Sequence, residues 1–382
     1  MSAIRELMDG WTGDFGARLA STIGENAHRL NVENIDALRF PGESVAFKRV
    51  SRAVLAAPLG VFSALHVIPP WERQGIAASL RAMKQHEEQL EWLHGRLADE
   101  ESRRLLAQII AYRVLGSRRM KMPLNRPQFW RERDAVSGLT TRRDIGSAGM
   151  LGAMDEFDLR PIGWPMRMRA HALNIHNTFM LEQYRLARPG APTVEVRPGD
   201  TVIDAGACWG DTSLYFAARA GDGGRVFAYE FVPENLAVLE TNLRLNPALA
   251  ARVTVVAKAL WRKDGVSLGY SPEASASEVR LDSNGERVAI TGSLDGLVED
   301  MALDQLDFVK MDIEGAEPEA LRGAERAIRR FRPRLAICVY HYLHHLWDIP
   351  RWIQGLGIGY SLHLGHFTIH KEETVLFAAP AD

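Results

Sequence analysis

Two glycines and a carboxylate at the end of an apolar run give this sequence its first chemical signal. The stretch Val202 to Phe216, VIDAGACWGDTSLYF, sets Asp204, Gly206 and Gly210 between that run and the start of a helix. Glycines there allow positive φ and close approach of the backbone to a ligand. A dinucleotide loop reads G-x-G-x-x-G, but this turn reads G-A-C-W-G, and the side chain of Cys208 obstructs a phosphate seat. The turn suits a ligand whose amino-acid end lies across it; the alternative is an ordinary tight strand-to-helix turn.

A second carboxylate follows the next apolar run. Glu230 closes RVFAYE, about twenty residues beyond the glycines, where an acidic side chain can accept hydrogen bonds from both hydroxyls of a ribose. A solvated glutamate at a strand end is the alternative. The position directly after the second run favours the ribose interpretation.

The elements that must position these residues alternate along the C-terminal part of the chain. Short β-rich runs are separated by helical patterns such as PENLAVLETNLRLN, and the runs cover residues 201–206, 225–230, 252–257, 306–312 and 333–340. This alternation predicts an α/β fold with a parallel, doubly wound sheet. Ligands of such sheets bind outside the carboxyl ends of the strands, so the residues that end each run are the candidates for chemistry.

The N-terminal part has a different pattern. Apolar residues recur at helical spacing through residues 1 to about 130, with Asp99 predicted to cap one helix and Gly116 to end it. Residues 134–152 are rich in Gly, Ser and Thr and are the expected linker. We therefore expect a mainly helical domain over residues 1–150, for substrate or partner binding, and a catalytic domain over residues 151–382.

Composition limits the partners. The 46 Lys and Arg residues nearly cancel the 48 Asp and Glu residues, which gives nucleic acid no strong general attraction. The apolar segment Ala53–Pro70 contains Pro58 and Gly60, so it predicts no spanning helix of roughly 20 residues. Two cysteines and the absence of a secretory pattern at the N-terminus lead us to expect a cytoplasmic protein without stable membrane insertion; oligomers stay open.

Four stretches, in this order, resemble the FkbM family of S-adenosylmethionine-dependent methyltransferases: VIDAGACWGDTSLYF, YEFVPENLAVLETNLRLN, FVKMDIEGAEPEALRGA and RPRLAICVYH. The resemblance covers roughly residues 170–378, and DIEGAE is its most specific part. It implies a class I methyltransferase sheet of seven strands whose last strand, expected at 373–379, is antiparallel. It also implies methyl transfer from S-adenosylmethionine to a hydroxyl, in a family associated with sugars, glycans and polyketide-type metabolites.

The resemblance also implies a cofactor site. Asp204 and the two glycines correspond to residues that hold the methionine part, Glu230 to the ribose ligand and Phe231 to the residue beside the adenine. Four residues upstream sit where such enzymes close over the cofactor, or belong to a helix that packs on the sheet: Asn177, Thr178, Phe179 and Tyr184. Cys208 departs from the general pattern, which prefers glycine, and we take it as a tolerated variant. The full set is Asp204, Gly206, Cys208, Gly210, Glu230, Phe231, Lys258, Ala259 and Asp312.

Methyl transfer to an alcohol needs a group that receives the acceptor proton. His341 is the expected general base, because a neutral imidazole is available near pH 7. Asp312 would orient His341 or the acceptor, and Glu314 would bind acceptor hydroxyls; Lys310 and Glu317 lie at the same strand end. The structural alternatives are a helix cap for Asp312, a helix-dipole contact for Glu317 and a core histidine at position 341.

We assign no metal from the sequence. A metal site is an alternative, with ligands drawn from His341, His344, His345 and Asp348 together with Asp312 and Glu314. The predicted function is O-methylation of a small-molecule or glycan acceptor. The rival hypotheses are N- or C-methylation, a catalytically silent module that binds S-adenosylmethionine, and a nicotinamide-dependent oxidoreductase, which the missing third glycine disfavours.

Overall fold

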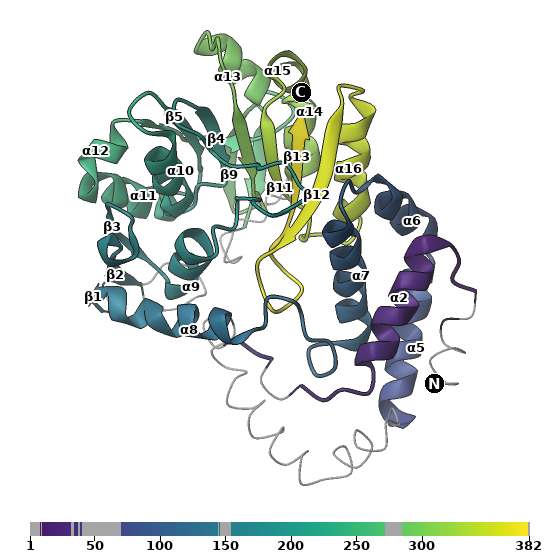
Figure 1. Ribbon diagram of the computed structural model, residues 1–382. Helices are drawn as coiled ribbons and strands as arrows, with labels where there is room; N and C mark the ends of the chain where they lie inside the picture. Colours follow the sequence, from purple (N-terminus) through teal and green to yellow (C-terminus); the bar gives the residue numbers. More distant parts are fainter. Residues whose placement is uncertain are drawn as a thin grey trace. The chain divides into compact units, whose positions relative to one another are not determined.

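A computed structural model of the chain describes residues 8, 10–31, 34–36, 39, 70–143, 145, 154–271 and 285–380. Its contacts divide the chain into a helical unit (Met1–Trp130 with His363–Thr374) and a sheet unit (Arg131–Leu362 with Val375–Asp382) (Figure 1). Apart from the helical backbone of its last residue, the segment Ala53–Pro70 lies outside the described residues. Within the described ranges, no helix combines the length and the apolar composition needed to cross a bilayer.

The helical unit follows the predicted periodicity. Asp99 Oδ1 accepts a hydrogen bond from the Ser102 amide at 2.9 Å, and Gly116, with φ of +73°, follows the last helical residue; the predicted cap and stop are confirmed. Helices α2, α5 and α7 run alongside one another (Figure 1). The helices are α2 (Gly13–Asn26), α5 (Pro70–Lys84), α6 (Glu87–Arg96) and α7 (Glu100–Leu115), after which α8 (Pro127–Ala135) leads into the sheet unit.

The sheet unit is built on seven strands in the order β12-β13-β11-β10-β4-β5-β6. Strand β13 pairs antiparallel with β11, and β4, β5, β6, β10 and β11 are parallel, as expected for a class I methyltransferase. The strands are β4 (Thr201–Ala205), β5 (Arg225–Tyr229), β6 (Val253–Val256), β10 (Phe308–Met311), β11 (Arg334–Cys338), β12 (Tyr360–His366) and β13 (Thr374–Pro380).

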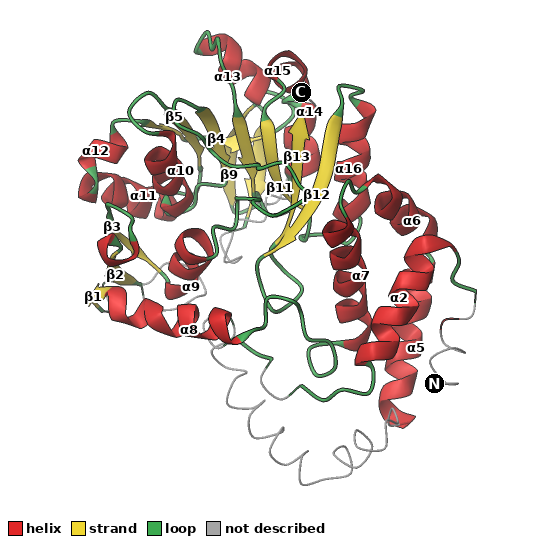
Figure 2. Cartoon of the chain, in the orientation of Figure 1, coloured by secondary structure: helices red, strands yellow, loops and turns green. Residues whose placement is uncertain are grey.

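Helices lie on both sides of this sheet (Figure 2). Every residue of β4 and β10 is therefore buried, which explains why these strands appear in the sequence as nearly continuous apolar runs. The helices are α10 (Asp211–Ala220), α11 (Pro233–Leu245), α12 (Pro247–Ala250), α13 (Leu294–Asp300), α14 (Glu317–Arg322), α15 (Glu325–Phe331) and α16 (His345–Gly355).

Two small sheets complete the unit. Thr140–Arg142 (β1) pairs with β2, so this part of the expected linker is a strand rather than a loop. The first small sheet adds β2 (Asp155–Asp158) and β3 (Arg167–Ala170), and the second contains β7 (Ala259–Leu260), β8 (Ser267–Tyr270) and β9 (Arg287–Gly292). Short helical segments are η1 (Val136–Leu139), η2 (Arg160–Ile162), α9 (Ala172–Asn174) and the π-helix η3 (Ile175–Met180).

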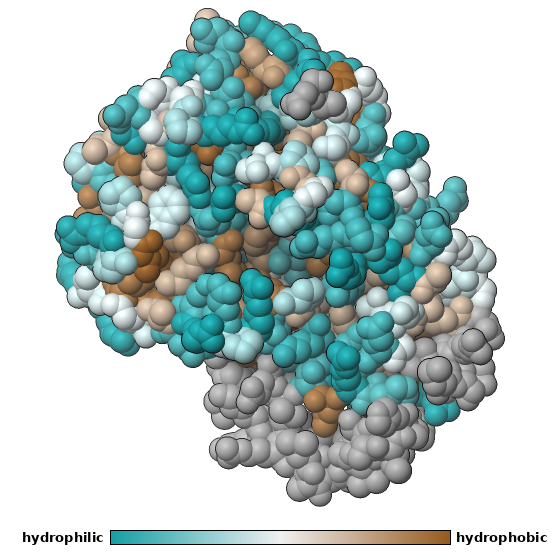
Figure 3. All heavy atoms as spheres, viewed as in Figure 1, coloured by the Kyte–Doolittle hydropathy of each residue, from teal (hydrophilic) through white to brown (hydrophobic). Residues whose placement is uncertain are grey.

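Hydrophilic residues cover most of the described surface in Figure 3, with apolar residues in scattered areas. Large hydrophobic side chains that are exposed in the described residues include Val288 and Ile290 on β9, Met301 after α13, and Tyr342 after β11.

The strand order reverses between β4 and β10. From β4 the chain proceeds outward through β5 and β6, and it then returns to add β10 and β11 on the other side of β4. Sheets of this type bind their ligands at the carboxyl ends of the strands that flank such a reversal, so the ends of β4 and β10 are the expected position of the site. Lys310 of β10 pairs in register with Asp204 of β4, so the predicted site residues beyond these strands become neighbours.

Candidate functional site

The turn after β4 is tight because three residues adopt positive φ. Gly206 and Gly210 have φ of +80°, and Cys208 has φ of +47°. A Cβ atom at Gly206 would lie 1.9 Å from the carbonyl oxygen of Asp312, so glycine is required by the close approach of the β10 end. A Cβ at Gly210 would lie 3.1 Å from Leu239 of α11, which is tight but less severe. Cys208 takes a left-handed conformation that costs a non-glycine residue about 1 kcal/mol.

Asp204 of β4 and Lys310 of β10 hold this turn in place from within the sheet. Both side chains are buried, and their charged atoms lie 3.1 Å apart. Lys310 Nζ donates to the carbonyl oxygens of Ala205 and Gly206 at 3.1 and 2.8 Å, while Asp204 Oδ2 accepts from hydroxyls at the start of α10. Burial lowers the pKa of Lys310, but the charges of Asp204 and Asp312 outweigh it and raise the pKa to about 12. Lys310 is therefore a permanent cation that positions the turn.

Glu230 lies at the end of β5 and is buried. Its Oε1 accepts hydrogen bonds from the amides of Phe231 and Val232 at 2.7 and 2.8 Å, while Oε2 has a contact of 3.4 Å with Asn235. Burial raises the pKa of Glu230, and these hydrogen bonds oppose the shift. The backbone bonds fix the carboxylate at the strand end and leave Oε2 with acceptor capacity for a ligand hydroxyl.

The other expected cofactor residues lie around an apolar cluster beyond β5. Phe231 packs edge-on against Tyr270 with a centroid distance of 5.1 Å, and Ala259 belongs to the same cluster. Lys258 is exposed, and its side chain passes over Gly292, where a Cβ would lie 2.9 Å from Lys258 Cδ.

Two residues from the segment 177–184 contact carboxylates at the strand ends. Thr178 in the π-helix donates its hydroxyl to Asp211 at 2.7 Å, and Tyr184 donates to Asp312 at 2.7 Å. The periodicity of the sequence gives no sign of the Thr178 contact, because the π-helix changes the spacing of its side chains. Tyr184 lies beyond the π-helix, outside any periodic pattern. The segment thus connects the β4 and β10 ends of the site.

A second cluster gathers carboxylates around His341. Asp312 Oδ1 and Glu314 Oε2 lie 3.3 and 3.4 Å from His341 Nε2, and Glu317 Oε1 lies 3.0 Å from Nδ1. Tyr340 donates its hydroxyl to Asp312 at 3.2 Å. The three expected catalytic residues are therefore brought together. Glu317, which the sequence also allowed as a helix-dipole contact, is fully buried against the imidazole.

Charge sets the protonation of this cluster. Burial lowers the pKa of His341, but the negative charges of Glu317, Asp312 and Glu314 outweigh it and raise the pKa to about 9. Burial raises the pKa of Asp312, but the charges of His341 and Lys310 hold it below its usual value. His341 is therefore an imidazolium near pH 7, and the neutral imidazole expected from the sequence does not apply to the protein without ligands.

The cluster also has the composition of a metal site. Asp312, Glu317 and His341 each offer one ligand atom, and these atoms lie within 4.8 Å of one another. Of the other histidines considered from the sequence, His344 is exposed, whereas His345 is buried with Nδ1 at 3.5 Å from Glu317. The grouping shares Asp312 and His341 with the sequence-based alternative and adds Glu317. The other expected ligands do not belong to it: Glu314, His344, His345 and Asp348.

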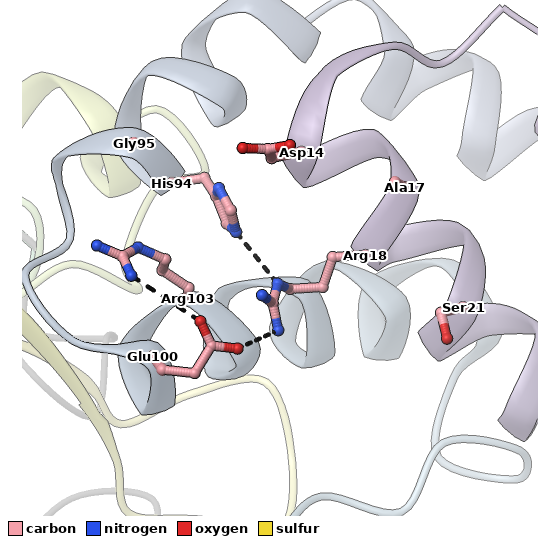
Figure 4. A pocket seen from close by; sticks show the side chains of 8 residues that line it. All are labelled: Asp14, Ala17, Arg18, Ser21, His94, Gly95, Glu100 and Arg103. Carbon is pink, nitrogen blue, oxygen red and sulfur yellow. Dashed lines mark hydrogen bonds and ion pairs between the residues drawn. The ribbon is translucent and has the colours of Figure 1, made fainter.

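A separate cavity of about 690 Å³ lies in the helical unit, lined by residues of α2, α6 and α7 (Figure 4). Arg18 binds Glu100 at 2.7 Å and donates to His94 at 3.2 Å, and Arg103 lies 3.9 Å from Glu100. Burial and the neighbouring Arg18 lower the pKa of His94. Arg18, Arg103 and Glu100 are thus paired with one another inside this cavity.

The residues at the β4, β5 and β10 ends fit an S-adenosylmethionine molecule. The backbone approaches closely at Gly206, and the Oε2 atom of the buried Glu230 has a contact of 3.4 Å with Asn235 and can accept a further hydrogen bond. The carboxylate of Asp204 is held by Lys310 at the base of the turn. Gly206 and Asp204 would hold the amino-acid end, Glu230 the ribose and Phe231 the adenine.

Comparisons with known proteins agree with this arrangement. Residues 204–360 match the family model of the methyltransferase FkbM domain. The methyltransferase FkbM of Methylobacillus flagellatus KT is 19% identical, with a TM-score of 0.53 over 87% of this chain and 70% of that chain, which shows the fold. Weaker matches include Aeropyrum pernix fibrillarin in complex with S-adenosyl-L-methionine (14% identity, TM-score 0.33, 50% of this chain and 70% of that chain). Another is a putative caffeoyl-CoA O-methyltransferase from Staphylococcus aureus (11% identity, TM-score 0.32, 48% of this chain and 76% of that chain).

No curated protein has significant sequence similarity to this chain. The family model, however, begins at Asp204 and extends through the strand ends that carry Glu230, Asp312 and His341. The part of the chain that carries these strand ends, residues 204–360, therefore matches a methyltransferase FkbM domain.

Proposed function

We propose that this domain methylates a hydroxyl oxygen of a small-molecule or glycan acceptor, and that the protein acts in the cytoplasm. The observation that carries the proposal is the group of Asp312, Glu314 and His341 at the ends of β10 and β11, next to the end of β4 that carries the glycine turn. Both cysteines are free thiols, which is consistent with a reducing compartment.

When bound, S-adenosylmethionine supplies a methyl group on a positively charged sulfur, so transfer breaks an S–C bond, forms an O–C bond and releases the acceptor proton. The residues of the chain must align the hydroxyl and receive that proton. His341 already carries a proton near pH 7, so a carboxylate oxygen of Glu314, which is more exposed than Asp312, receives the acceptor proton. His341 and Asp312 orient the acceptor.

Cofactor binding is tested first. Glu230→Ala should weaken the binding of S-adenosylmethionine at least tenfold, which corresponds to about 1.4 kcal/mol, because it removes the carboxylate proposed to hold the ribose. Calorimetry measures both affinities. Glu234→Ala is the matched control, because Glu234 lies in the first turn of α11, four residues after Glu230, and is an exposed partner of Arg287. Equal affinity in the wild type and Glu230→Ala would remove Glu230 from the site.

Methyl transfer is tested with deuteromethyl-labelled S-adenosylmethionine and an extract of metabolites and glycans. We expect a labelled O-methyl product by mass spectrometry and NMR. His341→Ala should lower turnover while cofactor affinity stays within about twofold. A labelled N-methyl or C-methyl product would replace the O-methyl proposal, and full turnover by His341→Ala would exclude its role.

A further inference from the structure

We propose that Asp312, Glu317 and His341 bind a divalent transition-metal ion of the Mn²⁺ or Zn²⁺ type. Metal binding itself is independent of the proposed function, whereas a role of the ion in activating the acceptor hydroxyl rests on it. Four features of the described residues carry this inference: the ligand geometry, the unsatisfied buried atoms, the charge balance and the donor chemistry.

The ligand atoms are already close together. Asp312 follows β10, His341 follows β11, and Glu317 begins α14, so three separate elements converge on one point. Their ligand atoms lie within 4.8 Å of one another. Metal bonds of roughly 2.0–2.2 Å place neighbouring ligands about 3–4 Å apart, so small side-chain rotations suffice to form the site.

Buried polar atoms at this point lack hydrogen bonds. Both ring nitrogens of His341 and the Oε2 atom of Glu317 have no hydrogen bond of good geometry. Their nearest charged neighbours are at ion-pair distance: carboxylate oxygens lie 3.0–3.4 Å from the nitrogens of His341, and Glu317 Oε2 lies 3.5 Å from His345 Nδ1. The Glu317 side chain is 0% exposed and the His341 side chain 7% exposed. A buried polar atom without a hydrogen bond costs about 1–3 kcal/mol, and coordination of an ion would remove this cost.

The charge balance also favours a divalent cation. Three carboxylates, those of Asp312, Glu314 and Glu317, lie within ion-pair distance of one imidazole ring. The nearby buried cation Lys310 is paired with Asp204. An imidazole binds a metal ion only through a nitrogen that carries no proton, so the bound site would hold neutral His341 and three carboxylates. Burial of this negative charge is costly unless it is paired, and a divalent ion would offset two of the three charges.

The donors select the class of metal. Two carboxylate oxygens and one imidazole nitrogen suit Mn²⁺ or Zn²⁺, whereas Mg²⁺ and Ca²⁺ prefer oxygen ligands alone. Three protein ligands leave a coordination position open, as in catalytic sites. An acceptor hydroxyl bound there would have a lowered pKa, and its proton would pass to a carboxylate oxygen of Glu314.

Metal binding is measured on the full chain after treatment with EDTA. Titration calorimetry with MnCl₂ and with ZnCl₂ should show one site with a Kd below about 100 μM for at least one of the two ions. His341→Gln and Asp312→Asn should each weaken binding at least about tenfold. His344→Gln and Asp348→Asn are matched controls, because both residues are exposed neighbours of the cluster, and they should bind as the wild type does.

The wild type provides a test that does not depend on the folding of variants. Pulsed electron paramagnetic resonance of the Mn²⁺ complex should detect coupling to one directly bound imidazole nitrogen. The proposal is overturned if neither ion binds the wild type below about 1 mM, if the bound Mn²⁺ lacks nitrogen coupling, or if the controls lose as much affinity as the ligand variants.

Parallel assays separate this proposal from the proposed function. Methyl transfer by a protein that binds neither ion would overturn the metal site and leave the methyltransferase activity standing. Binding of the ion and of S-adenosylmethionine without methylation of any acceptor would overturn the O-methylation proposal and leave the metal site standing.

Discussion

Replacing Lys310 by methionine tests whether the buried ion pair beneath the glycine turn stabilises the site. The Nζ atom has three partners: Asp204 Oδ1 at 3.1 Å and the carbonyl oxygens of Ala205 and Gly206 at 3.1 and 2.8 Å. At 3.1 Å and an effective dielectric constant of about 20, the attraction to Asp204 alone is about 5 kcal/mol. Desolvation of Lys310 offsets part of it, but Lys310→Met leaves the carboxylate of Asp204 buried and unpaired. We expect the free energy of unfolding to fall by about 3–5 kcal/mol.

Urea unfolding followed by circular dichroism measures this loss, and hydrogen exchange of peptides from β4 and β10 assigns it to the sheet unit. Arg244→Met is the control, because Arg244 forms an exposed pair with Glu240 at 3.7 Å and should lose no more than about 0.5 kcal/mol. The double variant Lys310→Met/Asp204→Asn should recover more than half of the loss, since the buried charge is gone while the side-chain oxygen can still accept from the α10 hydroxyls. A Lys310→Met variant within about 1 kcal/mol of wild type would refute the reasoning.

Two further predictions concern strain and pH. Cys208→Gly should leave the melting temperature unchanged or raise it, because glycine relieves about 1 kcal/mol of left-handed strain. Gly206→Ala should lower the free energy of unfolding by at least about 2 kcal/mol, since its Cβ would meet the Asp312 carbonyl. Equal melting temperatures of the two variants would contradict this. In the helical unit, burial lowers the pKa of His366 to about 3 and of His370 to about 4. The unfolded chain binds protons below about pH 6.5 while the folded unit does not, so stability should fall as the pH drops from 6.5 towards 4, by up to about 1.4 kcal/mol per pH unit for each histidine. Urea midpoints at pH 7.5 and 5 measure the effect, and identical midpoints would be the contrary result.

Much of the architecture could be predicted from local patterns. The alternation of apolar runs and helical stretches predicted the parallel sheet. The antiparallel last strand, which is confirmed, was implied by the resemblance to the FkbM family and not by a local pattern. The Asp99 cap and the Gly116 stop were also local signals, because capping depends on residues within one turn of the helix end. The strand at Thr140–Arg142 was missed because its pairing with β2 compensates for a sequence rich in loop residues.

The site residues could be located but not assigned their contacts. The sequence placed Asp312, Glu314 and His341 at strand ends as catalytic candidates. Lys310 and Glu317 were noted at the same strand end but received no catalytic role. Lys310 proved to be a buried support because register pairs it with Asp204 of another strand.

The sequence by itself determined the order of strands and helices, the turn at Gly206 and the residues at the strand ends, because these depend on neighbours in the chain. Only the tertiary structure decided which of those residues meet. The reversal between β4 and β10 brings Gly206 against Asp312, and the junction of β10, β11 and α14 surrounds His341 with carboxylates. The protonation of His341 follows from that gathering, since the pKa of a buried group depends on charges that are near in space and distant in the chain.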